Sequence, residues 1–356
     1  MATNGPFLFG GQAVAPGSRA TIDLPISNLS NHTPMTMPVQ IVHGHRPGPR
    51  LFISGALHGD EINGVEIIRR LLQRPELGTI AGTLVAIPIV NVFGFLANSR
   101  YLPDRRDLNR SFPGSAGGSL AGRLAHVFLS EILGRCSHGI DLHTAAIHRD
   151  NYPQVRANLD DPETLRLACA FGVEVVINAG EREGSLREQA AKRGIPVLVY
   201  EAGEALRFQD TAIRAGLEGV LGVMRALAML PADPGAPARD PIVARSSTWV
   251  RAATGGILRS EVPLGRHVER GTRLGVISDP FGEREVEVLA RTSGLVIGCT
   301  HLPVVNAGDA LFHIVDVTGT KATAISLDAA DIVAPDSTDA EAIRAFEAAE
   351  QSAMYD

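Results

Sequence analysis

Short apolar segments alternate with amphipathic helical segments between residues 51 and 229 of this chain. Strands that alternate with helices are typical of βαβ units, in which successive strands lie parallel. The pattern therefore predicts an α/β fold with a mainly parallel, mixed central sheet flanked by helices. We expect strands at residues 51–56, 82–90, 139–143, 173–177 and 196–201, and helices at residues 62–72, 120–133, 162–171, 185–192 and 211–229.

Composition marks one clear boundary. Residues 231–237 are rich in Pro, Gly and Ala, and such a run seldom continues a helix or a strand. Beyond it, glycines interrupt short apolar runs, which predicts a smaller all-β domain of barrel or hammerhead-like form. We therefore expect four segments: residues 1–45 (an N-terminal arm with edge strands), 46–232 (the α/β domain), 240–318 (the β domain) and 319–356 (a C-terminal tail).

The two ends of the chain are expected to be less regular than its middle. Residues 1–20 are rich in Gly, Pro and Ala and predict an irregular arm. Edge strands are expected next, at residues 21–26 and 37–44. In the tail, which is rich in Ala, Asp and Ser, we expect only a short helix near residues 340–349.

Candidate metal ligands follow two of the predicted strands. His58 and Glu61 are three residues apart in a turn that enters a helix, and this spacing puts both side chains on one face. His143 ends a separate strand. Functional groups collect at the carboxyl ends of parallel strands, so we expect the three to meet. Two imidazoles and a carboxylate are the ligand set of a catalytic zinc that keeps one position open for water. The sequence predicts a metal-dependent hydrolase with one zinc ion per chain.

Other charged residues could complete a hydrolytic site. Glu201 ends a predicted buried strand and is the candidate base that takes a proton from the attacking water and passes it to the leaving amine, with Glu204 in reserve. Arg100 could stabilise the oxyanion. Arg110, together with Asn109, could hold a substrate carboxylate, because a guanidinium binds this group through two parallel hydrogen bonds.

Two aspartates and three further histidines are judged by their positions. Asp107 and Asp141 are candidates to orient the ligand histidines by bonding to the far nitrogen of each ring. His267, His301 and His313 have no ligand-like spacing in the predicted β domain. They are left out of the predicted site.

Bulk composition limits the classes of partner. A net charge of −6 and a pI of about 6.0 argue against binding to nucleic acid. No apolar segment approaches the length of a membrane span, so no membrane partner is expected. Three widely spaced cysteines do not suggest a disulfide framework, which favours a cytoplasmic location. We therefore expect a small-molecule partner, and the sequence leaves a homo-oligomer open.

At this point the motifs resemble those of the succinylglutamate desuccinylase/aspartoacylase family, relatives of the zinc carboxypeptidases. The matching stretches are ALHGDEING at residues 56–64, DRRDLNRSFPG at 104–114, IDLHT at 140–144 and VYEAG at 199–203. The resemblance covers roughly residues 50–230, and the first two stretches together are highly specific. The chain departs from the common pattern at Arg105, where that pattern has Gly, and at Val92, where a Pro often follows the Asn. Arg105 could alter the rim of the pocket.

The resemblance implies a zinc carboxypeptidase-like fold and a role for each matching residue. Zinc would be bound by His58, Glu61 and His143, Glu201 would be the general base and acid, and Arg100, Asn109 and Arg110 would recognise the substrate. Family members cleave a linear amide, such as acetyl from aspartate or succinyl from glutamate, so a small N-acyl substrate is expected. A carboxypeptidase-type peptidase would share the metal site, and a zinc protein without catalysis would tolerate Glu201→Gln.

The predicted β domain has a resemblance of its own. Residues 265–275 and 293–297 resemble the lipoyl/biotinyl hammerhead. A carrier of that kind needs an attachment lysine, and none occurs between residues 193 and 320, so attachment of either cofactor there is excluded. Its position after the α/β domain suggests a lid or an oligomer contact beside the zinc site.

Overall fold

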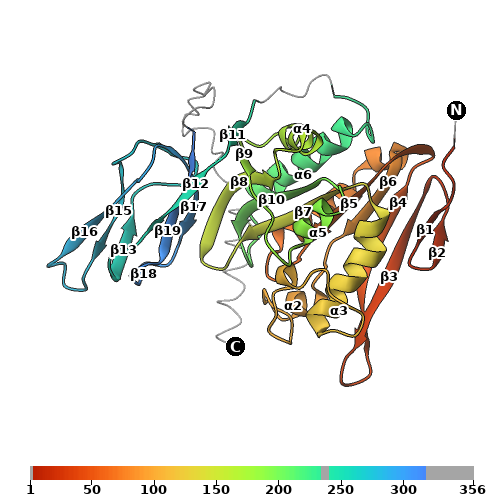
Figure 1. Cartoon of the computed structure of the whole chain (residues 1–356), viewed down its shortest axis with the longest axis horizontal. Helices are drawn as coiled ribbons and strands as arrows, with labels where there is room; N and C mark the ends of the chain where they lie inside the picture. Colours follow the sequence, from red (N-terminus) through yellow and green to blue (C-terminus); the bar gives the residue numbers. More distant parts are fainter. Residues whose placement is uncertain (1–2, 234–239, 318–356) are drawn as a thin grey trace, which may run out of the picture. The chain divides into compact units, whose positions relative to one another are not determined.

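A large mixed sheet organises the part of the chain that the computed structural model describes, residues 3–233 and 240–317 (Figure 1). The first strands are β1 (Phe7–Phe9), β2 (Gln12–Val14), β3 (Ser18–Asn28), β4 (Pro34–His43), β5 (Arg46–Gly55), β6 (Ala81–Ile87), β7 (His138–Ala145), β8 (Arg149–Ala157), β9 (Val175–Asn178) and β10 (Val197–Glu204). The later ones are β11 (Ile242–Ala244), β12 (Ser247–Arg251), β13 (Gly256–Ser260), β14 (His267–Val268), β15 (Arg273–Ser278), β16 (Glu285–Leu289), β17 (Gly294–Thr300), β18 (Val304–Val305) and β19 (Ala310–Asp316).

The middle of this sheet is parallel. β5 pairs with β6 and β7, and β7 pairs with β10, all in parallel. Antiparallel strands flank them, with β4 beside β6 and β8 beside β10. Every residue of β6 is buried, as expected for a strand covered on both faces. The prediction of a mixed α/β sheet is confirmed.

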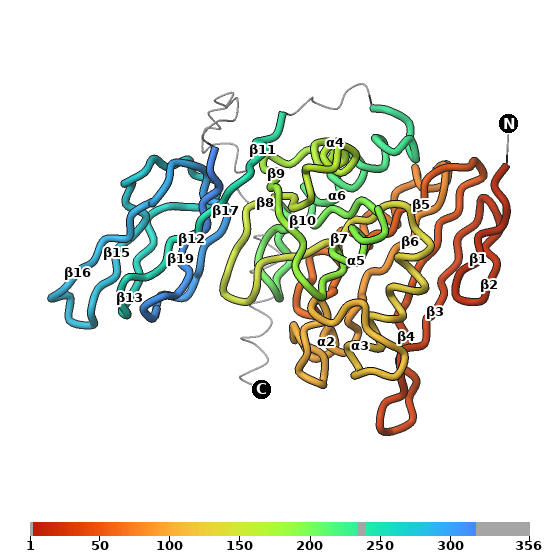
Figure 2. The backbone as a smooth tube through the Cα atoms, viewed as in Figure 1, coloured from red at the N-terminus to blue at the C-terminus, as the bar shows by residue number. Residues whose placement is uncertain are grey.

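Helices cover both faces of the sheet (Figure 2). They are α1 (Asn63–Leu72), α2 (Val92–Leu96), α3 (Leu120–Val127), α4 (Pro162–Ala170), α5 (Leu186–Ala191) and α6 (Asp210–Ala226). α1, α4 and α6 pack into one apolar core, while α3 and α5 pack into a second. The predicted helix at residues 120–133 is α-helical only to Val127 and continues as a π-helical turn over Phe128–Ile132.

The prediction of an irregular N-terminal arm is wrong. β1 and β2 form an antiparallel hairpin, and its Phe7 and Phe9 are buried in the core that holds α3. The turn consists of Gly10 and Gly11, which both have positive φ, a backbone conformation that glycine adopts without steric cost. The Gly-Gly pair between two apolar runs is a hairpin signal. The helix predicted near residues 340–349 lies outside the described residues.

The C-terminal region is all-β, as predicted. It contains a small separate sheet with the order β16-β15-β13-β18. Its other strands extend the large sheet, because β17 pairs with β8 and β11 pairs with β9. These ladders join the region to the α/β part through backbone hydrogen bonds, which a hinged lid would have to break. The segment boundaries stay a prediction. Within the described ranges, no helix combines the length and the apolar character that crossing a bilayer requires.

Candidate active site

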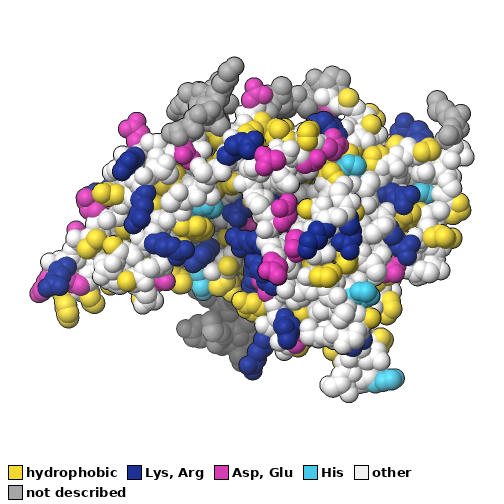
Figure 3. All heavy atoms as spheres, in the orientation of Figure 1, with side chains coloured by type: hydrophobic (Ala, Val, Ile, Leu, Met, Phe, Trp, Pro, Cys, Tyr) yellow, Lys and Arg dark blue, Asp and Glu magenta, His cyan; other side chains and the backbone are white. Residues whose placement is uncertain are grey.

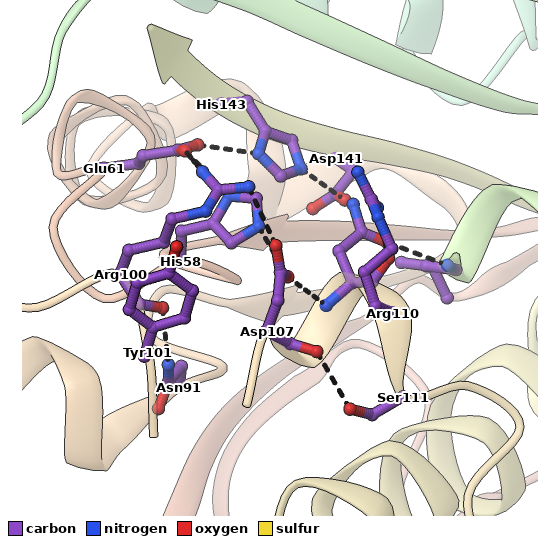
Figure 4. Close-up of polar contacts among 12 residues, drawn as sticks. His58, Glu61, Asn91, Arg100, Tyr101, Asp107, Arg110, Ser111, Asp141 and His143 are labelled. Atoms are coloured by element: carbon purple, nitrogen blue, oxygen red, sulfur yellow. Dashed lines mark hydrogen bonds and ion pairs between the residues drawn. The ribbon is translucent and has the colours of Figure 1, made fainter. Parts of the chain in front are cut away.

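His58, Glu61 and His143 meet at the carboxyl end of the parallel strands (Figure 4). His58 Nδ1 lies 2.7 Å from one Glu61 oxygen, and His143 Nδ1 lies 2.7 Å from the other. All three side chains are buried, with exposed fractions of 4%, 2% and 5%. The structure therefore brings the three predicted ligands into one cluster.

The local backbone explains how His58 and Glu61 reach this position. His58 follows β5, and Glu61 precedes α1 in the same connection. Gly59, between them, lies so close to Gly94 that a Cβ atom on Gly59 would be 2.0 Å from the Gly94 carbonyl carbon. Only glycine permits this approach. The connection between β5 and α1 therefore packs closely against the backbone of α2.

A second layer of carboxylates holds the two imidazoles. His58 Nε2 lies 3.1 Å from Asp107 Oδ1, and His143 Nε2 lies 2.8 Å from Asp141 Oδ2. Asp141 in turn accepts a hydrogen bond from the Ser54 hydroxyl at 2.7 Å. Each imidazole thus turns Nδ1 towards Glu61 and Nε2 towards an aspartate. This is the arrangement in which an outer carboxylate fixes the tautomer and orientation of a metal-binding histidine.

Charge coupling within the cluster is strong. Burial opposes the charged form of His143, but Asp141 and Glu61 together hold its pKa well above the ordinary value. The pKa of His58 is raised in the same way, against burial, by Glu61 and Asp107. Burial would raise the pKa of Glu61, yet the two imidazoles hold it well below its usual range. The carboxylates of Glu61, Asp107 and Asp141 therefore stabilise positive charge on the two imidazoles or between them.

This donor set fits a divalent metal. One ligand atom from each of His58, Glu61 and His143 lies within 4.8 Å of the others. Two nitrogens and a carboxylate oxygen are the donors of three-ligand catalytic zinc sites, which keep a further position for water or substrate. A dication would supply the positive charge that protons on the imidazoles otherwise provide.

Arg100 lies at the edge of the cluster. Its two terminal nitrogens donate to Glu61 Oε1 and to Asp107 Oδ2, each at 3.0 Å. A guanidinium carries five N–H groups, so these two bonds leave others for a ligand. Arg100 therefore holds Glu61 and Asp107 by hydrogen bonds and also lines the cavity beside the cluster.

Asn109 and Arg110 also line that cavity. The Asn109 side-chain oxygen accepts a hydrogen bond from the Leu186 backbone at 3.0 Å, which leaves its amide N–H groups as the free donors. Arg110 is exposed and donates to the Asn109 carbonyl. The pair offers donors only, as a carboxylate-binding site requires.

Glu201 stands directly beside a predicted metal ligand. It pairs with His143 in the parallel ladder between β10 and β7, and it lines the cavity. Its carboxylate accepts a hydrogen bond from Asn151 at 2.9 Å. β10 is mostly buried, as predicted, but Glu201 itself is only half-buried. The reserve candidate, Glu204, bonds to the His148 backbone and to Arg207 instead, and it is not part of the cavity wall.

The cavity beside the cluster has a volume of about 760 Å³, and part of its wall comes from residues that sequence reasoning missed. These include Arg149, Arg156, Arg182, Arg187, Arg245, Trp249 and His313. Trp249 and His313, on β12 and β19, stack with ring centroids 4.5 Å apart. His313 therefore lines the cavity but lies outside the cluster of candidate metal ligands. Ligand spacing carries no signal for such residues, which meet only through strand pairing.

Comparisons with known proteins agree with the motifs. The profile of the succinylglutamate desuccinylase/aspartoacylase catalytic domain matches residues 47–227. The N-alpha-acetyl-L-2,4-diaminobutyric acid deacetylase of Halomonas elongata is 28% identical over 313 residues, which cover 83% of this chain and 90% of that relative. The chain belongs to the succinylglutamate desuccinylase/aspartoacylase family. This is a family of N-acyl amino acid deacylases, and the resemblance inferred from the motifs is confirmed.

Solved structures show the same fold. The product-bound ectoine utilization protein EutE (DoeB) of Ruegeria pomeroyi matches with a TM-score of 0.75 at 22% identity, over 84% of this chain and 94% of that one. A succinylglutamate desuccinylase/aspartoacylase of Rhodobacter sphaeroides matches with a TM-score of 0.73 at 26% identity, over 84% of this chain and 95% of that one. Both matches extend past the catalytic profile, so the C-terminal β region belongs to the shared architecture.

Proposed function

We propose that this protein is a zinc-dependent hydrolase that removes an N-acyl group from an amino acid or a related small amine. One observation supports the proposal most: a buried His58–Glu61–His143 cluster opens onto a cavity, and Glu201 stands next to His143. Family membership makes a linear amide the expected bond. A structural zinc would normally take a fourth protein ligand instead of facing a cavity.

The chain's own residues would divide the work as follows. His58 Nδ1, Glu61 and His143 Nδ1 would hold the metal, with Asp107 and Asp141 orienting the two rings. When bound there, zinc would lower the pKa of a coordinated water to roughly 7 and would polarise the substrate carbonyl. The Glu201 carboxylate takes the proton of the attacking water and delivers it to the leaving nitrogen.

Substrate positioning falls to the donors around the cluster. The N–H groups of Arg100 that are not bonded to Glu61 or Asp107 would stabilise the developing oxyanion. The amide of Asn109 and the guanidinium of Arg110 would hold the carboxylate of the amino acid. Two fixed points, the metal and this carboxylate, orient the amide between them, which supplies much of the rate enhancement.

The expected binding partner and cellular location of the protein are part of the same proposal. The partner is a small N-acyl compound, and neither nucleic acid nor a membrane is expected. A cytoplasmic location and a possible homo-oligomer stay predictions from the sequence. The carboxypeptidase-type activity is the alternative, because it would use the same metal cluster.

The test begins with metal analysis of the purified protein. A screen with acetyl-, succinyl- and formyl-amino acids follows, with short peptides in parallel. Because the Halomonas relative is named for an acetylated diamino acid, that compound belongs in the screen. We expect about one zinc per chain and turnover of an N-acyl amino acid. Faster cleavage of peptides would favour the alternative, and full activity without a divalent metal would refute the proposal.

A further inference from the structure

Arginines surround the candidate general base, but none of them is paired with it. Seven arginines line the cavity that Glu201 faces. Figure 3 shows dark-blue arginine and lysine side chains gathered near the middle of the face in view. Within residues 3–233 and 240–317, however, no arginine or lysine forms an ion pair or a hydrogen bond with the Glu201 carboxylate. Such a partner would stabilise the charged carboxylate and make it a poorer base.

A neutral side chain holds Glu201 instead. Asn151 Nδ2 donates a hydrogen bond to Glu201 Oε2 at 2.9 Å, and both residues line the cavity. In the described part of the chain this is the only hydrogen bond of the Glu201 side chain, so Oε1 stays available for a water. Arg187 is near enough to attract Glu201 electrostatically. An amide has no net charge, so it fixes the direction of the carboxylate without neutralising it.

A β-bulge explains why Asn151 points towards Glu201. The ladder between β8 and β10 pairs Gln154 with Glu201, and its next pair is Asn151 with Gly203. Two residues of β8, the second of them Pro153, therefore lie opposite one residue of β10. Side chains alternate along a regular strand, so a residue three positions before Gln154 would point to the other face. The extra residue reverses this alternation, and proline, which has no N–H to donate, is tolerated at a bulge.

The C-terminal β region confines Asn151 from the other side. Gly298 on β17 is paired with Asn151 in the ladder between β17 and β8. A Cβ atom on Gly298 would lie 3.2 Å from Asn151 Oδ1 and equally close to the Cβ atom of His313. The neighbouring Gln154 also contacts β17, because its Nε2 donates to the Ile297 carbonyl at 3.3 Å. The oxygen of the Asn151 amide thus packs against β17, while its nitrogen faces Glu201.

We infer that Asn151 is a positioning residue for Glu201, and that the C-terminal β region takes part in the reaction by holding Asn151 in place. The inference rests on the proposed function for the role of Glu201. A carboxylate that receives a proton from water and then delivers it to nitrogen has to stay within hydrogen-bond distance of both. The Asn151 amide limits the rotation of this carboxylate, and β17 limits the movement of the amide. The C-terminal β region is thus a fixed part of the site and not a lid.

Replacing Asn151 tests the contact directly. The zinc-loaded protein is assayed with the N-acyl amino acid that is hydrolysed fastest in the screen described above. Asn151→Ala should lower kcat about tenfold, as expected for loss of a hydrogen bond to a charged group, with KM and metal content nearly unchanged. Asn151→Asp keeps the shape of the side chain but places a second carboxylate beside Glu201, so its kcat should fall at least as far. Asn306→Ala, at an exposed position outside the cavity, should keep the wild-type kcat.

The kind of loss distinguishes positioning from other roles. If Asn151 only filled space, the Asp variant would be more active than the Ala variant. If Asn151 bound the substrate, KM would rise while kcat changed little. Either result would overturn the inference. In the Glu201→Gln background, Asn151→Ala should cost less than about twofold, because the group that it positions is gone. A second tenfold loss in that background would also overturn the inference.

Gly298→Ala tests the contribution of the C-terminal β region without removing a polar group. The added methyl group would push the Asn151 amide by a few tenths of an ångström, so kcat should fall about threefold. The double variant with Asn151→Ala should match Asn151→Ala alone. Gly255→Ala adds a methyl group at an exposed position of the same region and should keep the wild-type kcat. An unchanged kcat in Gly298→Ala, or losses that multiply in the double variant, would refute the role of β17.

The same measurements separate this inference from the proposed function. If the wild type hydrolyses no amide, or if Glu201→Gln keeps its activity, the proposed function fails and the role of Asn151 fails with it. If Glu201→Gln loses its activity while Asn151→Ala keeps the wild-type kcat, the inference fails alone. Thermal unfolding shows which variants are folded, and Asn151→Asp and Gly298→Ala provide the test if Asn151→Ala is not.

Discussion

The two ends of the cavity differ in how their charges are satisfied. At the metal-ligand end, both nitrogens of His58 and of His143 lie within hydrogen-bond distance of a carboxylate. At the other end, Arg156 and Arg187 retain buried donors without partners in the described ranges. The first end is therefore complete as a hydrogen-bond network within the protein, while the second is incomplete.

The largest expected effect is at the complete end. His58→Ala removes one candidate ligand and takes one hydrogen-bond partner from each of Glu61 and Asp107, which both keep Arg100. We expect loss of bound metal and activity at the limit of detection, because a catalytic zinc site of this kind needs all three protein ligands. Elemental analysis and a deacylation assay measure both. A variant that retains its full metal content would show that the ligands are misassigned.

The next effect separates chemistry from metal binding. Glu201→Gln keeps the shape of the side chain and its contact with Asn151, but it removes the proton acceptor. We expect normal metal content and a kcat at least about a hundredfold lower. Glu204→Gln is the matched control, because Glu204 does not line the cavity. Equal losses in the two variants would remove Glu201 from its role.

These two ends also differ in how far they could be predicted from the sequence. His58 and Glu61 share a motif, and His143 and Glu201 end apolar strands, so a rule about strand ends sufficed to group them. Arg156 lies on β8, whose mostly half-buried, polar sequence with Pro153 does not resemble a sheet strand. Trp249 and His313 join it from β12 and β19, through pairing that no local pattern encodes. Side chains assembled by register between distant strands were therefore missed.

Removing one outer carboxylate should have an intermediate effect. In Asp141→Asn, the amide can no longer attract the proton on His143 Nε2 as strongly, and Ser54 keeps a partner. We expect zinc affinity to fall about 10–100-fold. A competition titration with a chelating dye measures this loss. Glu218→Gln, at an exposed position, should bind zinc like the wild type, and an unaffected Asp141→Asn would mean that His143 needs no outer support.

The pH dependence of stability should reverse on loading with metal. A histidine whose folded pKa is raised, as for His143, adds stability that is complete below its unfolded pKa and is lost as pH rises through the folded pKa. The metal-free protein should therefore lose this contribution between about pH 6.5 and the raised value. Protons compete with zinc for the same nitrogens, so the zinc-dependent gain should grow with pH. Thermal unfolding with and without zinc tests this. His143→Gln should weaken the trend of the metal-free protein to the part that His58 supplies, and it should abolish the zinc-dependent gain.

The smallest effect is expected at the incomplete end, and it should have the opposite sign. Arg156→Gln relieves repulsion with Arg187 and removes a charged donor that lacks a partner. We expect the free protein to become more stable by about 0.5 kcal/mol. Denaturant unfolding without ligand measures the change, with Arg123→Gln as the comparison. A destabilised Arg156→Gln would mean that this guanidinium supports the fold.

The ladder between β8 and β17 has a consequence for how such an enzyme can change. Gly298 and Cys299 on β17 are paired with Asn151 and Asp150 on β8, the strand that also carries Arg156. Backbone pairing therefore joins the C-terminal β region to β8, the strand that lies beside Glu201 on β10. Exchanging the C-terminal β region for that of a relative would disrupt these backbone hydrogen bonds. A change in substrate preference should therefore arise more readily from point substitutions on β8, β12 and β19 than from exchange of the whole region.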